Sequence, residues 1–272
     1  MPYVRRTVLL MILATPLMGA LASAHDFWLV PDAFQVAAMG EVVVRGQTSS
    51  AFPTSVSAVT PDRVTEARIV GAADDERITA LSTRDNSLVL RHRPRTAGQK
   101  VVAVAVGWRH VNETAASFRK YLVAEGAEDA LKHYDRTGQL PTADLVRRYA
   151  KYGKTVVEVG DGPRAFGRVI GQPLEFIPLS DPSGATVPSE LRMRLMFQGK
   201  PLAGALVHAG VAPRAAPKAT ELTLTTSDEG VVSIPVGATG LWNVRTIHVV
   251  PAPSGADANW DVHWATFVWT VP

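Results

Sequence analysis

A histidine follows directly after a segment that has the three parts of a secretory signal. Arg5-Arg6 gives a positive start, residues 7–21 form an apolar stretch, and Ala22-Ser23-Ala24 is a small-x-small cleavage site. We therefore predict that residues 1–24 are a signal peptide, cleaved before His25. Cleavage would free the α-amine of His25, which can close a chelate on one metal ion together with the ring Nδ1. The alternative is that the residue after the cut is arbitrary and has no ligand role.

Two further histidines lie in apolar runs near the end of the chain. His248 lies in Ile247-His248-Val249-Val250, and His263 lies in Val262-His263-Trp264. If the two runs pair as neighbouring strands, their rings can lie about 5 Å apart on one face. We predict metal ligands at His25, His248 and His263, with His208 as a weaker candidate. The alternative for each strand histidine is a structural residue of intermediate burial.

The sequence contains no cysteine, which restricts the chemistry that any site can use. Thiolate metal sites, a catalytic cysteine and a lipid anchor on an N-terminal cysteine are excluded. A transition metal would be held by His, Asp, Glu, Met or backbone groups, which suit nickel, cobalt, copper or zinc. His92 lies between Arg91 and Arg93, whose charges disfavour a bound cation, so we do not count it as a ligand.

Charge and motif content exclude several classes of protein. The net charge of +3 includes Arg5 and Arg6, so the chain from residue 25 carries 3 − 2 = +1. No dense basic run with interleaved aromatics occurs, so we expect no nucleic-acid partner. No later apolar run approaches the roughly 20 residues of a membrane helix, so we expect a mature protein that does not span the membrane. We expect no enzyme, because G-x-S-x-G, H-E-x-x-H, Walker and Rossmann patterns do not occur.

The histidines must be positioned by strands and helices that the residue patterns predict. Alternating and β-branched runs in residues 25–112 and 165–272 are typical of short antiparallel strands. Leu, Ala, Lys and Arg at helical spacing predict two or three helices in the segment 113–160, including one over Leu145–Tyr152 with Thr142 as its N-cap. The predicted fold is mainly β, with two antiparallel β-sandwich domains of Ig-like or transthyretin-like type and a helical segment and linker between them.

Basic and aromatic residues gather near the end of this predicted helical segment. They are Arg147, Arg148, Tyr149, Lys151 and Tyr152. Such a face can bind an anion. The alternative is a face that is solvated or packed against a neighbouring sheet.

Several short motifs occur in a set order along the chain. They are His25-Asp26-Phe27-Trp28-Leu29, Phe118-Arg119-Lys120-Tyr121-Leu122, Pro173-Leu174-Glu175-Phe176-Ile177-Pro178, Gly240-Leu241-Trp242-Asn243-Val244-Arg245-Thr246-Ile247-His248 and Asn259-Trp260-Asp261. This order resembles the exported NikM-like family, whose members accompany nickel and cobalt uptake systems in Gram-negative bacteria. The resemblance implies metal handling, with His25 and His248 as the matching histidines, but no defined ligand set. Residues 199–205 also resemble the opening of transthyretin-like or carboxypeptidase-regulatory modules, which are antiparallel sandwiches without implied enzymatic activity.

Taken together, the histidines and the resemblance lead us to expect a periplasmic accessory protein. It would bind a divalent transition metal, nickel or cobalt foremost with copper or zinc as alternatives, and serve uptake by a membrane transporter. Imidazole and amine ligands do not choose among these four metals. Two other functions stay open: a copper oxygenase with an N-terminal histidine brace, and a cell-envelope interaction protein without a metal.

Overall fold

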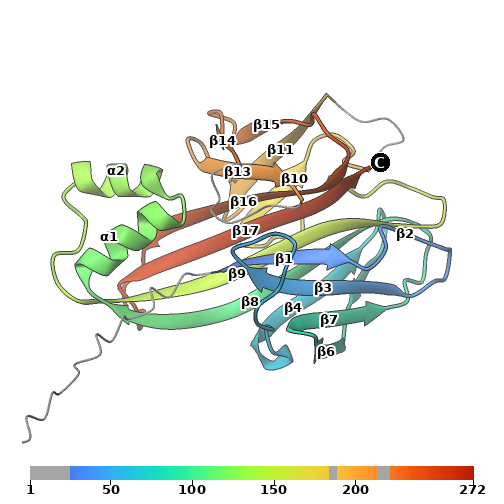
Figure 1. Cartoon of the computed structure of the whole chain (residues 1–272), viewed down its shortest axis with the longest axis horizontal. Helices are drawn as coiled ribbons and strands as arrows, with labels where there is room; N and C mark the ends of the chain where they lie inside the picture. The colour runs from blue at the N-terminus through green and yellow to red at the C-terminus, as the bar shows by residue number, and fades with distance from the viewer. Residues whose placement is uncertain (1–24, 184–188, 213–220) are drawn as a thin grey trace, which may run out of the picture.

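A nine-stranded sheet forms the centre of the molecule in this computed structural model (Figure 1). The structure describes residues 25–183, 189–212 and 221–272, so the predicted signal peptide lies outside the described residues. The strands follow the order β14-β13-β16-β17-β9-β8-β4-β5, and the short strand β2 pairs with β9. Their bounds are β2 Gln35–Val36, β4 Val64–Val70, β5 Asp75–Arg77, β8 Gly98–Glu113, β9 Leu145–Val159, β13 Leu206–Val211, β14 Leu222–Thr225, β16 Gly240–Pro251 and β17 Trp260–Val271. Neighbours are antiparallel, except that β17 and β2 each run parallel to β9.

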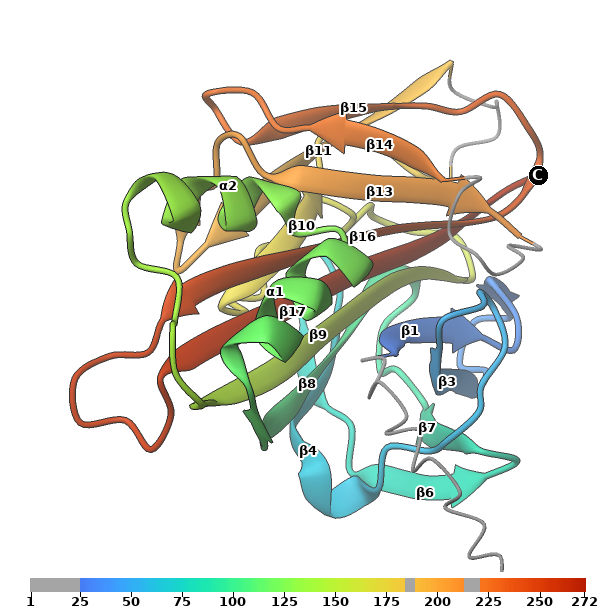
Figure 2. The ribbon, with the colours of Figure 1, turned by 60° about the vertical axis from the view of Figure 1, so that its left-hand side comes forward.

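Two four-stranded sheets cover opposite faces of this central sheet (Figures 1 and 2). One contains β1 Asp26–Pro31, β3 Val42–Ser49, β7 Ser87–His92 and β6 Ala80–Arg84, and the other contains β10 Leu174–Pro178, β11 Glu190–Phe197, β12 Lys200–Pro201 and β15 Val231–Pro235. Phe27 of β1 lies in one apolar cluster with Val157 of the central sheet. Phe176 of β10 lies in another with Phe267. The fold is therefore mainly β, as predicted, and its central sheet takes strands from both 25–112 and 165–272.

Two α-helices follow β8, within the segment where helices were predicted. They are α1 Ala115–Ala124 and α2 Glu128–Arg136, and the Thr114 hydroxyl caps α1 by accepting from the Ser117 N–H at 3.1 Å. Phe118 and Tyr134 pack against Trp260, so the helices cover the ends of β16 and β17 on the β1 side of the sheet (Figure 2). Neither helix is long and apolar enough to cross a membrane, and no other helix of the described residues is.

The prediction of a helix over Leu145–Tyr152 was wrong, because these residues form the first half of strand β9. β9 lies between β8 and β17, which both pair with it. The two arginines of this half of β9 are tolerated there because each has an acidic partner. Arg147 Nε donates to Glu113 at 2.5 Å, and Arg148 Nε donates to Asp261 at 2.6 Å. A strand that is covered on both faces lacks the apolar–polar alternation that would have indicated it.

Successive side chains of β17 lie on opposite faces of the central sheet. Trp260, Val262 and Trp264 pack in the cluster that contains the helices. Ala265 and Phe267 pack in the cluster that contains β10 and β11. His263 follows the second series, so its ring lies on the β10–β11 side.

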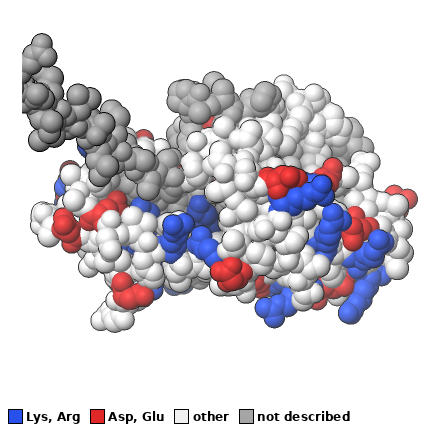
Figure 3. All heavy atoms as spheres, turned by 60° about the horizontal axis from the view of Figure 1, so that its bottom comes forward, with Lys and Arg blue, Asp and Glu red and all other residues white. Residues whose placement is uncertain are grey.

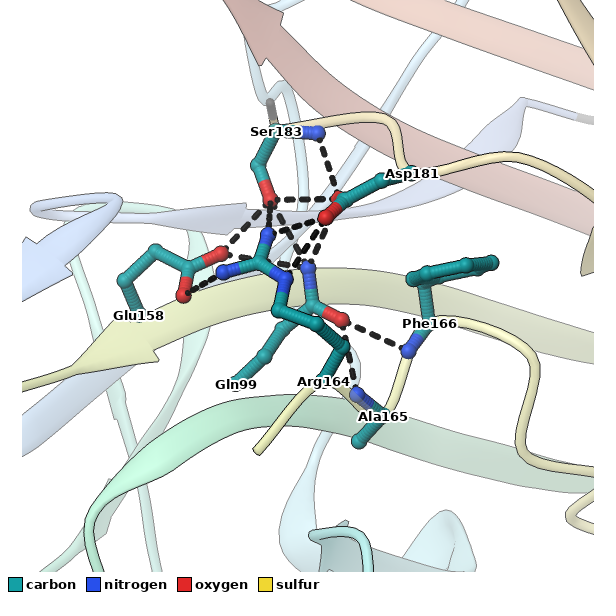
Figure 4. A network of polar contacts seen from close by, with 7 residues as sticks. All are labelled: Gln99, Glu158, Arg164, Ala165, Phe166, Asp181 and Ser183. Carbon is teal, nitrogen blue, oxygen red and sulfur yellow. Dashed lines mark hydrogen bonds and ion pairs between the residues drawn. The ribbon is translucent and has the colours of Figure 1, made fainter. Parts of the chain in front are cut away.

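The segment between β9 and β10 is held by a network of polar contacts around the buried Gln99 (Figure 4). The Gln99 side-chain oxygen accepts from the backbone N–H groups of Ala165 at 2.9 Å and Phe166 at 2.6 Å. Arg164 donates to Glu158 of β9 at 2.7 Å and to Asp181 at 2.6 Å. This segment, which has no helix or strand of its own, is thereby fixed to the start of β8 and the end of β9.

Candidate functional site

His248 and His263 are directly opposite each other on the antiparallel strands β16 and β17. The hairpin predicted from their two apolar runs is therefore confirmed, and both rings lie on the same face of the sheet. His263 is buried with 4% of its surface exposed, and His248 is partly buried. Cross-strand partners have Cβ atoms about 4.5–5.5 Å apart, which is close enough for two imidazoles to share one ion.

Aromatic residues from three other strands surround this histidine pair. The Phe197 ring of β11 contacts both imidazoles, with centroids 4.4 Å from His248 and 5.1 Å from His263. The Tyr152 hydroxyl lies 3.2 Å from His263 Nδ1. Trp108 lies edge-on to His263 at 5.1 Å and is 38% exposed, so it marks the side on which the pair approaches solvent.

Trp108 reaches the pair because β8 is irregular at that point. The register of β8 against β9 shifts between Val106 and Arg109, which is where a bulge re-aims side chains. The Arg148 guanidinium stacks over the Trp108 ring at 4.6 Å and holds it in place. Sequence reasoning missed Phe197, Trp108 and Tyr152, because they lie far from the histidines in the chain.

Both imidazoles of the pair are neutral near pH 7. Burial lowers the pKa of His248 to about 4, and burial together with the neighbouring His248 lowers the pKa of His263 to about 4. A neutral imidazole offers one nitrogen lone pair to a metal ion. When His263 Nδ1–H donates to the Tyr152 hydroxyl, Nε2 of His263 carries that lone pair, which is how outer-shell partners usually orient metal-bound histidines.

The histidine pair supplies two ligands for a metal ion, and no larger cluster of metal-ligating side chains occurs among the described residues. Within residues 25–183, 189–212 and 221–272, no group of three or more His, Cys, Asp or Glu residues is placed to hold a metal ion. An ion on His248 and His263 would therefore complete its coordination with water or with a group brought by a partner. Open positions of this kind are typical of sites that exchange ligands.

His25 lies on the other face of the central sheet. The Lys151 ammonium donates a hydrogen bond to the His25 carbonyl. Lys151 is next to Tyr152 in β9, so the two side chains lie on opposite faces of the sheet, and Tyr152 is the one that faces the histidine pair. His25 lines a cavity of about 430 Å³ together with Arg63, Arg109, Arg147 and Lys151. The structure therefore does not bring His25 together with His248 and His263, and the four cations around it disfavour a metal ion.

The weaker candidate His208 is also apart from the pair. It is paired with Arg245 in the sheet, and its Nε2 lies 3.4 Å from the Gly126 carbonyl at the end of α1. Burial lowers its pKa, and the nearby Arg245 charge acts in the same direction. These contacts describe a partly buried strand histidine that packs against the helices.

The sequence matches the family model described as "Domain of unknown function (DUF4198)" over residues 22–250. This chain belongs to that family. The matched region includes His25 and His248 and ends before His263. The family description assigns no function, so it neither supports nor opposes a metal site. No curated protein matches the sequence.

Several solved structures resemble the chain only distantly. The D0-D1 domain of intimin is 11% identical, with 90% of this chain and 98% of that chain covered and a TM-score of 0.21. The titin domains z1z2 in complex with telethonin are 10% identical, with 92% and 96% covered and a TM-score of 0.21. Trypsin-activated alpha-2-macroglobulin from Escherichia coli is 10% identical, with 93% of this chain and 16% of that chain covered and a TM-score of 0.26. At these scores, none of the three defines the fold of this chain.

Proposed function

We propose that this protein binds a divalent transition metal ion at His248 and His263 in the periplasm and delivers it to a membrane transporter. The single observation that supports the proposal most is the direct cross-strand pairing of two neutral histidines, one buried and one partly buried. Neutral imidazoles favour late first-row ions over magnesium and calcium. Two protein ligands hold such an ion weakly enough for release to a second protein.

Nickel or cobalt is the metal that we propose, on the strength of the resemblance to the NikM-like family. Intrinsic affinity alone favours copper among the divalent ions, so selection of nickel would depend on geometry or supply. The aromatic residues around the pair contribute to geometry, because Phe197 limits the approach to both rings. We further interpret the two halves of the chain as β-sandwiches that share the central sheet. In this proposal, the signal peptide directs export.

The proposal is tested by titrating the exported, metal-stripped protein with nickel, cobalt, copper and zinc by calorimetry. His248→Ala and His263→Ala should each weaken binding by at least about tenfold, since each removes one of two ligands. His133→Ala is the matched control, because His133 is exposed on α2 and should leave binding unchanged.

His25→Ala separates the histidine pair from the site predicted from sequence. If the pair holds the ion, His25→Ala should bind with wild-type affinity. If His25→Ala instead loses as much affinity as His248→Ala, the amine chelate at His25 is the better description. Wild-type affinity in both His248→Ala and His263→Ala would disprove the proposal.

A further inference from the structure

The cavity beside His25 is lined by basic residues and has no acidic residue in its wall. It has a volume of about 430 Å³ and lies between β3, the 3₁₀ helix Pro61–Arg63, β8 and β9. Four cationic side chains line it, those of Arg63, Arg109, Arg147 and Lys151. This cavity is on the opposite face of the central sheet from the histidine pair and is independent of the proposed metal site.

Two of these cations are buried in the protein. Lys151 is 6% exposed, and its ammonium lies 5.3 Å from the Tyr149 ring centre and 5.6 Å from that of Trp264. It donates to the His25 carbonyl, and no salt bridge joins it to any residue that the structure describes. Burying a lysine in this way is costly, and the buried carboxylates Asp26 and Glu125 offset only part of that cost, because the pKa of Lys151 is still lowered.

Arg147 has unused hydrogen-bonding capacity beside the same cavity. Its side chain is 3% exposed, its Nε donates to Glu113 at 2.5 Å, and its guanidinium stacks over the Tyr121 ring at 3.8 Å. Its Nη1 is buried without a hydrogen-bond partner in the described part of the chain. Buried arginine nitrogens are normally satisfied, so an orphaned one indicates a missing partner.

The remaining two cations lie nearer to solvent and repel Lys151. Arg63 Nη2 donates to the Gly107 carbonyl at 3.1 Å, whereas Arg109 is exposed and has no ion pair with a described residue. Burial, and to a smaller extent the charges of Arg63 and Arg109, lower the pKa of Lys151 to about 8, against the opposing effect of Asp26 and Glu125. A negative ligand would relieve this mutual repulsion.

Four cationic side chains gather at this cavity. On the side of the molecule seen in Figure 3, acidic and basic side chains are interspersed. A membrane surface or a nucleic acid would need a continuous basic area. The cluster of cations in one cavity and the volume of that cavity instead suit a small molecule.

We propose that this cavity binds a small organic anion with two or three carboxylates. Guanidinium and ammonium groups are the donors that carboxylates prefer, and several of them converge here. The volume of about 430 Å³ leaves room for a ligand larger than a single inorganic ion, which favours charges carried on a carbon skeleton.

The test is calorimetry of the exported, metal-stripped protein with citrate, succinate and inorganic phosphate as separate probes at low salt. Citrate or succinate should bind more tightly than phosphate. The double variant Arg63→Ala/Arg109→Ala should lose about tenfold or more in affinity for the carboxylates, since it removes two charged donors. Both residues lie toward solvent, and circular dichroism checks that the variant is folded.

Arg192→Ala is the matched control, because it removes one exposed arginine of β11 on the far side of the central sheet. It should bind the carboxylates like the wild type, as should His248→Ala if the two sites are independent. Lys151→Met tests the buried charge separately and should also weaken binding. Binding of phosphate as tight as that of citrate, equal affinity in the double variant and the wild type, or no binding of citrate and succinate would each overturn the inference.

Discussion

Lys151 and Tyr152 are adjacent in β9, yet they serve opposite faces of the central sheet. The Lys151 ammonium bonds the His25 carbonyl on one face, and the Tyr152 hydroxyl lies 3.2 Å from His263 Nδ1 on the other. One strand therefore lines both the basic cavity and the histidine pair. The two sites can be altered independently, although a change in the path of β9 would affect both.

The buried histidine pair should make the protein less stable in mild acid. The pKa of each histidine is about 4 in the folded protein and about 6.5 when unfolded, so the unfolded chain binds more protons between these values. The contribution of the two histidines to the free energy of unfolding is fully present above pH 6.5. It is lost as the pH falls toward 4, at up to about 1.4 kcal/mol per pH unit for each histidine. Urea unfolding at pH 7.5, 6.0 and 5.0 measures this slope. His248→Gln/His263→Gln should flatten it, and an unchanged slope in that variant would show that other groups cause it.

Gln99→Leu should destabilise the protein by about 2–4 kcal/mol. Gln99 is fully buried, and its side-chain oxygen accepts from two backbone N–H groups, those of Ala165 and Phe166. A leucine of similar size would leave both donors without an acceptor, and each unsatisfied donor costs about 1–3 kcal/mol. Chemical denaturation measures the change, with the exposed Gln139→Leu as a control that should stay within about 0.5 kcal/mol of the wild type. Equal stability of the two variants would mean that the network in Figure 4 contributes little.

Lys154→Met should cost about 3–5 kcal/mol in unfolding free energy. Lys154 and Glu175 form a salt bridge of 2.8 Å between β9 and β10, with side chains 1% and 2% exposed. Removing the lysine leaves a buried carboxylate without its counter-charge. Lys154→Met/Glu175→Gln should recover part of the loss, because glutamine can still accept from the Ile170 N–H that Glu175 now bonds at 2.6 Å. The exposed Lys132→Met is the control; a double variant as unstable as the single one would contradict this account.

The exported protein should begin at His25. The apolar run ends and the small-x-small site falls just before this residue. Intact-mass spectrometry of periplasmic protein should give the mass of residues 25–272. A start at Asp26 or later would remove His25 and with it any role of the α-amine of that residue, while leaving the histidine pair intact.

Local patterns were sufficient to predict the strands that carry the histidine pair. The alternating runs around His248 and His263 predicted a hairpin, and β16 and β17 form it. In contrast, no local pattern indicates that β9 lies beside β17, because the two strands are far apart in the chain and pair in parallel. The charged residues of β9 suggested a helix, and their partners Glu113 and Asp261 could be assigned only in three dimensions.

The face on which His25 lies could not be predicted either. The alternation along a strand indicates which of its residues share a face, but it does not indicate which side of the sheet another strand will cover. β1 packs on the side opposite to β10, and this choice separates His25 from His248. The basic cavity is likewise a three-dimensional feature, since Arg109 and Lys151 come from the paired strands β8 and β9 and Arg63 comes from the 3₁₀ helix before β4.

The position of β17 in the central sheet sets an order for the maturation of the chain. β17 is made after every other described strand, yet it lies between β9 and β16 and completes the apolar clusters on both faces. The helices and the β10–β11 side can therefore not close their interiors while residues 260–271 are still being synthesised or translocated, whereas the cluster around Phe27 and Val157 contains no residue of β17. A chain that emerges in this order keeps these two regions open, and accessible to chaperones and proteases, until β17 pairs with β9 and β16 and brings His263 opposite His248.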